Sequence, residues 1–313
     1  MANRRDFLKM SALLTAGTLA GSQVLTSCGG GSKKPQAPTK SIGVQLYSVR
    51  EPIADLGIQE VLTQLSKIGY KTLELASYND SNGTMYGLQP EELKKMVEDL
   101  GMKITSSHVG GGEMFPMEYW KKAADDHARC GCKYLVVPIY RFDPENQLGL
   151  QEKTDLIKAF CEYLEQVGMT IVTGGMVKVG FHNHWYEFEK IKEGETDELI
   201  YDYMLSNTSA SHVFFENDTF WTQYTGDIAP TGTNSVNFIN KYPGRFPLMH
   251  MKDEYEIGQS GLIDFQPIFD ACYANGMKEY FIEVENYNND QNKDPMIGIK
   301  QSYDFFANAD YVK

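Results

Sequence analysis

One phrase returns along the chain: a charged, amphipathic stretch ends at a glycine, and a run rich in β-forming residues follows at once. It reads KIGYKTLEL, DLGMKITSSH, RCGCKYLVVPI, EQVGMTIV and ANGMKEYFIEVE, with the glycines at Gly69, Gly101, Gly131, Gly168 and Gly276. Glycine suits the left-handed backbone position that closes a helix. The repetition therefore predicts helices that alternate with strands along most of the chain.

Eight such strands can be placed. We expect them at residues 42–48, 71–76, 103–108, 133–139, 177–184, 212–218, 246–252 and 279–285. Helical patterns lie between them, among others at residues 58–68, 90–100, 154–167 and 264–274. Strands that alternate with helices form parallel βα units, and a closed (β/α)8 barrel needs about 250 residues. The sequence thus predicts an α/β fold, a single-domain (β/α)8 TIM barrel, over residues 41–313. The main alternative is a doubly wound sheet, whose dinucleotide-binding form has a Gly-x-Gly-x-x-Gly motif after the first strand, and residues 42–57 lack one.

The N-terminal residues have the features of an export signal. NRRDFLKM is followed by the apolar run SALLTAGTLAGSQVL, then by TSC and GGGSKKPQAPTK. The apolar run is too short for a spanning helix, and no later segment is apolar over about 18 residues. RRDFLK resembles a twin-arginine (Tat) signal, and LTSC resembles the lipobox of bacterial lipoproteins. The resemblance implies a signal peptide at residues 1–27, lipidation of Cys28, a flexible tether at residues 28–40 and an exported, membrane-anchored protein that faces the periplasm or cell surface.

Charge and cysteine content narrow the partners. The formal net charge is −13, and no run of Lys or Arg follows the tether, so a nucleic-acid partner is not expected. The membrane is expected as a partner only through the lipid anchor, and the sequence leaves open whether the barrel forms a homo-oligomer. Cys130 and Cys132 lack a second ligand pair at zinc-finger spacing, so we interpret them as structural.

Polar and charged residues gather where the predicted strands end, and the carboxyl ends of the strands hold the active site in TIM barrels. Four of the six histidines lie there. Because side chains alternate along a strand, residues two apart share a face, and His182 with His184 and Glu283 with Glu285 form such pairs. Together with Glu187, Asp218 and Glu283, the four histidines supply nitrogen and carboxylate oxygen without thiolate, which suits one divalent ion, Mn²⁺, Mg²⁺ or Zn²⁺. The other two of these histidines are His108 and His250, and further polar residues at the strand ends are Gln45, Glu74 and Lys252.

Several runs resemble a known superfamily, the sugar isomerases and epimerases of the xylose isomerase-like barrels. They are GVQLYSVR, FHNHWYEF, ENDTFWTQYTGD, KYPGRFPLMHMKD and FIEVENY. The resemblance implies a metal held by Glu187, Asp218, His250 and Glu283. Two of these positions stay open: Glu285 faces the same way as Glu283, and His182 or His184 can replace Glu187. Relatives with several zinc ions have a histidine where this chain has Trp221, so the nuclease type of site is not expected.

The resemblance further implies a metal-dependent sugar isomerase or epimerase that works through an enediolate. Export favours a non-phosphorylated sugar or keto-sugar as substrate. A keto-glycoside or inosose dehydratase or lyase would share the intermediate, and a non-catalytic carbohydrate-binding lipoprotein is the alternative from another class. We assign proton transfer or substrate orientation to Glu187, Glu283, His108, His184 and Lys252. We expect substrate contacts from a second set: Gln45, Glu74, His182, Trp185, Trp221 and Glu285, with Phe220 and Tyr224 as further apolar platforms.

Overall fold

A computed structural model of the chain describes residues 40–142, 148–175, 177–191, 197–224, 234–289 and 291–313. The predicted signal peptide, Cys28 and all of the predicted tether except Lys40 lie outside these residues. The residues from Lys40 to Lys313 belong to one compact unit. No helix within the described ranges combines the length and the apolar character that crossing a bilayer requires.

The strands of the described chain form a closed parallel barrel in which each strand pairs with its neighbours in sequence order and β8 pairs with β1. This confirms the predicted single-domain (β/α)8 TIM barrel. The strands are β1 (Gly43–Gln45), β2 (Thr72–Leu75), β3 (Lys103–His108), β4 (Tyr134–Val137), β5 (Lys178–His182), β6 (Val213–Asp218), β7 (Leu248–Lys252) and β8 (Glu279–Glu283).

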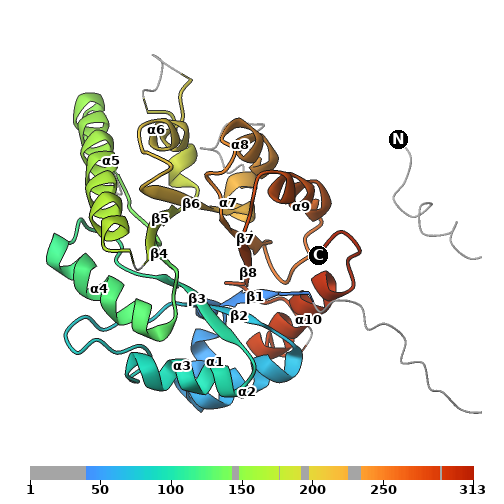
Figure 1. Cartoon of the computed structure of the whole chain (residues 1–313). Coiled ribbons are helices and arrows are strands. Elements are labelled where there is room, and N and C mark those ends of the chain that lie inside the picture. Colours follow the sequence, from blue (N-terminus) through green and yellow to red (C-terminus); the bar gives the residue numbers. More distant parts are fainter. Residues whose placement is uncertain (1–39, 143–147, 176, 192–196, 225–233, 290) are drawn as a thin grey trace, which may run out of the picture. The chain divides into compact units, whose positions relative to one another are not determined.

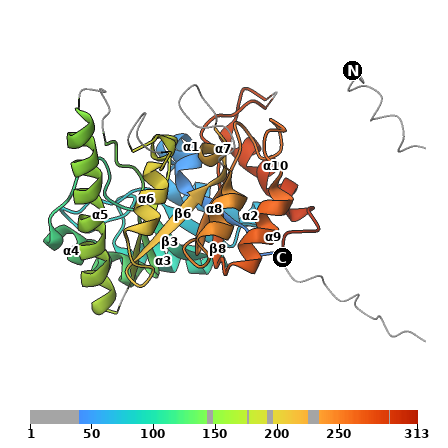
Figure 2. The same ribbon diagram turned by 90° about the horizontal axis from the view of Figure 1, so that it is seen from above.

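Helices surround this barrel (Figure 1), and the view turned by 90° shows them packed along its sides (Figure 2). They are η2 (Leu46–Val49), α1 (Arg50–Leu56), α2 (Ile58–Ile68), α3 (Pro90–Asp99), α4 (Met117–Cys130), α5 (Leu150–Thr173), η3 (Tyr186–Phe188), α6 (Ile200–Ser206), α7 (Thr219–Gln223), α8 (Ser235–Lys241), α9 (Phe265–Ala274) and α10 (Pro295–Ala307).

Four of the five glycines of the recurring phrase end a helix, as predicted: Gly69, Gly101, Gly131 and Gly276 all have positive φ. The fifth prediction is wrong. Gly168 lies inside α5, and MTIV continues the helix instead of forming a β-rich run. A Cβ at Gly168 would lie 2.4 Å from the backbone oxygen of His212, so glycine is required there by the close approach of α5 to the chain before β6.

Two apolar layers support the barrel. The larger lies between strands and helices, and a smaller cluster of Val136, Phe214, Leu248 and Phe281 packs with Tyr134. Phe214 alternates with Glu216 and Asp218 on one face of β6, so the smaller cluster fills the barrel interior below the polar residues. Gly180 on β5 leaves room for it, since a Cβ there would lie 2.4 Å from the Phe214 ring. Because the smaller cluster fills the lower interior, the inward-facing polar groups lie above it, at the carboxyl ends of the strands.

Candidate active site

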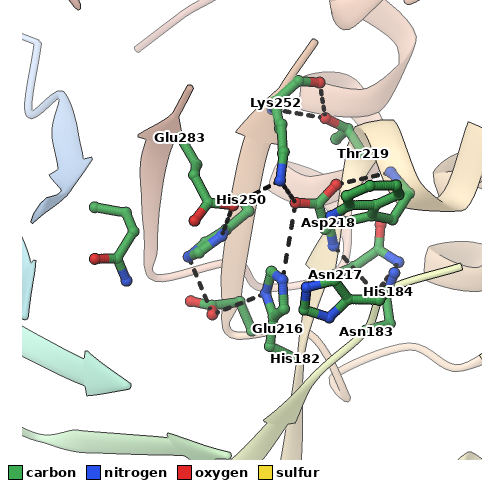
Figure 3. A network of polar contacts seen from close by, with 12 residues as sticks. His182, Asn183, His184, Glu216, Asn217, Asp218, Thr219, His250, Lys252 and Glu283 are labelled. Atoms are coloured by element: carbon green, nitrogen blue, oxygen red, sulfur yellow. Dashed lines mark hydrogen bonds and ion pairs between the residues drawn. The ribbon is translucent and has the colours of Figure 1, made fainter. Parts of the chain in front are cut away.

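Polar side chains from separate strands meet above the apolar cluster. Strand register sets their height: Asp218 pairs with His250 across β6 and β7, and Lys252 pairs with Glu283 across β7 and β8. His182, at the end of β5, pairs with Glu216. Figure 3 shows these side chains pointing toward one another. The predicted gathering of polar groups at the carboxyl ends of the strands is therefore present.

The lower part of the site consists of two carboxylates and two imidazoles, which we call the lower group: Glu74, His108, Glu216 and His250. Glu216 Oε2 lies 3.0 Å from His108 Nε2 and 3.1 Å from His250 Nε2. Glu74 Oε2 lies 2.5 Å from the same His250 nitrogen. Both carboxylates are fully buried. Buried charges are costly unless they are paired, so the imidazole N–H donors of this group stabilise its two carboxylates.

The upper part of the site surrounds the ammonium group of Lys252. Its Nζ lies 3.1 Å from Glu283 Oε2, 2.5 Å from Glu285 Oε1 and 3.8 Å from Asp218 Oδ2. Glu283 Oε2 also lies 3.2 Å from His250 Nδ1, which links the two parts (Figure 3). Three carboxylates thus surround one fixed cation. Because the charges of the upper part do not balance, an additional cation would be attracted there.

The carboxylates differ in acidity. Burial raises the pKa of Glu216 to about 7, and burial also raises the pKa of Asp218 to about 7, although Lys252 opposes it. Burial disfavours ionisation of Glu283 as well, but the charges of Lys252 and His250 outweigh burial and hold its pKa well below the usual range. Carboxylates whose pKa values are pushed apart are typical of acid–base chemistry.

Lys252 and His184 supply two different proton donors or acceptors beside these carboxylates. Burial disfavours the charged form of Lys252, but the surrounding carboxylates outweigh it and raise its pKa, so the ammonium form is stable. Burial and then the charge of Lys252 lower the pKa of His184 to about 3, which keeps its imidazole neutral. Both lie against Trp221: Lys252 Nζ is 4.7 Å from one of its ring centroids, and the His184 ring centroid is 5.5 Å from one.

Within the described chain, two sets of residues offer ligand atoms that all lie within 4.8 Å of one another, as a bound cation requires. Asp218 Oδ2 and His182 Nδ1 are buried without a hydrogen-bond partner. Unsatisfied buried polar atoms are uncommon, and a metal would give Asp218 the missing partner. The residues therefore fit a divalent cation. The sets are His108, His182, Glu216 and His250, and His182, Asp218, His250 and Glu283.

The motif FHNHWYEF lies at the end of β5 and in the turn that follows. The asparagine between its two histidines has a structural role. Asn183 Oδ1 accepts hydrogen bonds from the backbone N–H of Asp218 and from Asn217 Nδ2, each at 3.1 Å. Asn183 thus joins the end of β5 to the end of β6, and His182 and Asp218 are held beside each other.

The structure does not bring Glu187 into either set of ligand atoms. Glu187 lies in η3, where its carboxylate accepts the backbone N–H of His184 at 2.7 Å. It is fully buried, and burial raises its pKa to about 8. The other three predicted ligands lie together with His182, the alternative that the sequence offered. That any of them binds a metal stays a prediction.

The predicted substrate contacts are spread over a wider region. Gln45 and Glu74 are fully buried and hydrogen-bonded to each other at 2.8 Å. Trp185 lines a small cavity with Tyr186 and Arg141, none of which belongs to the sets of ligand atoms. The three aromatic residues of α7 and the turn after it pack on one another, with ring centroids 5.0 to 5.7 Å apart: Phe220, Trp221 and Tyr224.

The sequence analysis missed Glu216. The signal was present: Glu216 precedes Asp218 by two residues on a predicted strand, and the same period of two pairs His182 with His184 and Glu283 with Glu285. It was overlooked because the family resemblance assigns one carboxylate to this strand. Glu216 faces three imidazole nitrogens, with His182 Nδ1 at 3.4 Å as the third, so it is central to the lower group.

Comparisons with known proteins agree with the observed fold. The family model described as the xylose isomerase-like TIM barrel matches residues 62–309. A sugar phosphate isomerase/epimerase from Parabacteroides distasonis is 34% identical, covers 88% of this chain and 100% of that chain, and superposes with a TM-score of 0.74. A second one from that organism is 29% identical over 90% of this chain and 98% of that chain, with a TM-score of 0.75.

A more distant solved structure is 3-keto-D-glucoside 4-epimerase from E. coli. It is 17% identical, covers 85% of this chain and 98% of that chain, and has a TM-score of 0.60. At that identity the likeness shows the fold alone. A search of curated proteins found no match.

Proposed function

Because the chain belongs to the family of xylose isomerase-like TIM barrels, we propose that it is a divalent-metal-dependent isomerase or epimerase of a non-phosphorylated sugar or keto-sugar. The observation that carries this proposal is the convergence of Asp218, His250 and Glu283, with His182, within 4.8 Å of one another. Structural neighbours that are sugar isomerases and epimerases support an enzyme.

In this proposal the cation is held by one nitrogen or oxygen from each of β5, β6, β7 and β8: His182, Asp218, His250 and Glu283. A bound divalent cation supplies Lewis acidity, which polarises a sugar carbonyl and stabilises negative charge on its oxygen. His182 takes the place that the sequence analysis gave to Glu187.

The residues of the chain carry the protons. The proton on the carbon beside a sugar carbonyl is weakly acidic, and removing it leaves an enediolate. Glu283 is ionised at neutral pH because Lys252 and His250 stabilise its charge against burial, so it can accept that proton. Lys252, as an ammonium group, faces the same position and stabilises the charge that develops on a substrate oxygen. His184, a neutral imidazole beside Lys252, can donate a hydrogen bond to a hydroxyl group.

Solvent exchange tests the proposal. The metal-loaded protein is incubated with keto-sugars in heavy water, and deuterium at the carbon next to the carbonyl is measured. We expect exchange in the wild type and a loss of at least about 100-fold in Glu283→Gln. Glu279→Gln, at the other end of the same strand, is the matched control and should exchange normally. A sugar that binds without any exchange would instead support the carbohydrate-binding alternative.

The dehydratase or lyase remains a second candidate because of Lys252. Its ammonium group lies 2.5 Å from Glu285, at the partly exposed edge of the site, where it could protonate a departing hydroxyl or glycosidic oxygen. An eliminating enzyme would release water or an alcohol from the same enediolate. Mass spectrometry of the products distinguishes the two outcomes: isomerisation leaves the mass unchanged, whereas elimination lowers it.

We further propose that the protein is exported and anchored by a lipid on Cys28. Support comes from the twin arginine at residues 4–5 and the LTSC sequence. Export is the reason for preferring a sugar without phosphate. Membrane fractionation of wild type and Cys28→Ala tests this, since only the wild type should remain with the membrane.

A further inference from the structure

His250 has a carboxylate at each of its ring nitrogens. Nε2 lies 2.5 Å from Glu74 Oε2, and Nδ1 lies 3.2 Å from Glu283 Oε2. The ring is fully buried, and the His108 ring stacks on it with centroids 5.1 Å apart and planes at 16°. Packing therefore holds the imidazole plane, so that the two nitrogens face opposite parts of the site.

Glu74 is held in place independently of His250. Its Oε2 accepts a hydrogen bond from Gln45 Nε2 at 2.8 Å, and its Oε1 accepts one from Ser106 Oγ at 2.6 Å. Gln45 is fixed in turn, because its Oε1 accepts the backbone N–H of Tyr47 at 2.9 Å. The side chains of Glu74, Gln45 and Ser106 are fully buried. This carboxylate is thus oriented by the fold.

An ionised carboxylate can only accept hydrogen bonds. The His250 nitrogen that faces Glu74 must therefore carry a proton. Without a cation, Nδ1 also donates to the ionised Glu283, and a bound cation would replace that proton, which leaves the lone pair of the neutral imidazole on Nδ1. Nδ1 faces Glu283, which belongs with Asp218 to the second set of candidate ligand atoms. A carboxylate behind a ligating histidine is known to fix its tautomer and orientation.

We propose that Glu74 is a positioning residue that fixes His250 in the tautomer whose Nδ1 binds the cation, with Gln45 and Ser106 holding Glu74 in place. This inference rests on the proposed function. It assigns Gln45 and Glu74 to the support of a ligand instead of to substrate contacts. It also selects one of the two sets of ligand atoms: the set with Asp218 and Glu283, not the set in which His250 Nε2 would bind beside Glu216.

Nitrogen-15 spectra of histidine-labelled wild type test the proposal directly, with Cd²⁺ as a diamagnetic probe. We expect His250 to coordinate through Nδ1 and to carry a proton on Nε2, with His108 not coordinated. Coordination through Nε2, or coordination by His108, would overturn the proposal. The experiment needs no variant, so a failure of a mutant to fold does not affect it.

Metal affinity provides the second readout. We expect Glu74→Gln to weaken Mn²⁺ or Cd²⁺ binding by about 10- to 100-fold, the range for residues behind a ligand. Glu279→Gln makes the same change at the amino end of β8, where the carboxylate pairs with Lys103, and should leave the affinity unchanged. Equal affinity in Glu74→Gln and wild type would overturn this inference and leave the proposed function standing. A wild type that binds neither ion would instead refute the proposed function itself.

Discussion

At the residue scale, three neighbouring strands share one pattern: an inward-facing apolar residue is followed, two residues later, by an inward-facing titratable one. Phe214 is followed by Glu216, Leu248 by His250, and Phe281 by Glu283. The apolar side chains exclude water from below, which strengthens the interactions of the charged groups above them. Single substitutions in this layer should therefore have large and specific effects.

The first prediction concerns His250. His250→Ala should abolish metal binding, because His250 is one of the two residues, with His182, that belong to both sets of candidate ligand atoms. The barrel should remain folded, with an unchanged far-UV circular dichroism spectrum. Metal content after dialysis measures the effect. His212→Ala is the control, since His212 pairs with Glu165 near the amino end of β6, away from the site. Unchanged metal content in His250→Ala would contradict the assignment.

The second prediction concerns pH and His127. Burial lowers the pKa of His127 to about 4, although its hydrogen bond to the carbonyl of Ala123 opposes the shift. Between pH 6.5 and about 4 the unfolded chain takes up a proton on this residue and the folded chain does not. The free energy of unfolding is therefore highest above pH 6.5. As the pH falls from 6.5 to about 4, protonation of His127 in the unfolded chain lowers it by up to about 3 kcal/mol.

Urea titrations at several pH values measure this effect on the free energy of unfolding. In His127→Gln the part of the pH dependence that comes from this residue should be missing. Parallel pH profiles for wild type and variant would show that His127 does not titrate in this way.

At the element scale, the accuracy of the predicted bounds differs from element to element. The strand predicted at residues 103–108 has the bounds of β3, whereas the helix predicted at residues 154–167 is α5 (Leu150–Thr173), which is longer at both ends. The helix predicted at residues 58–68 is present with the same bounds as α2. The strand predicted at residues 177–184 covers only Lys178–His182, because Asn183 and His184 leave the ladder to form the turn that holds the site. A strand ends where its neighbours stop pairing, which local sequence does not encode.

The third prediction tests the close approach of α5. Alanine normally favours a helix over glycine by about 1 kcal/mol, but Gly168→Ala should lower the free energy of unfolding by about 1 to 3 kcal/mol. The reason is that the added Cβ would meet the backbone at His212, which cannot move as a side chain does. Met169→Ala, at the next and half-exposed position, should change stability by less than about 0.5 kcal/mol. Denaturant unfolding measures both, and a more stable Gly168→Ala would refute the argument.

At the scale of the whole molecule, the sequence predicted the closed barrel because eight runs of β-forming residues alternate with helical patterns along it. It could not predict the lower group. Glu74 and His250 are 176 residues apart, and their contact depends on barrel closure and on register. The same limit applies to Glu187. The family resemblance assigned it to the metal, whereas the turn after β5 directs its carboxylate to the backbone N–H of His184.

The fourth prediction concerns stability of the whole barrel. Mn²⁺ at about 100 times its dissociation constant should raise the free energy of unfolding by about 2.7 kcal/mol, because a ligand that binds only the folded chain stabilises it. For a domain of this size the melting temperature should rise by about 5 to 10 °C. Calorimetry with and without a chelator measures the shift. Asp218→Asn should not show it, and an equal shift in that variant would point to binding elsewhere.

The pairing of β8 with β1 has a consequence for biosynthesis. Glu283 lies on the last strand of the barrel, so the ribosome has made most of the chain before the last of the proposed metal ligands exists. Nascent chains that stop short of β8 should be unable to retain the ion, however well their earlier strands have formed. Retention of the ion would then indicate that synthesis is nearly finished and that β8 has paired with β1 to close the barrel.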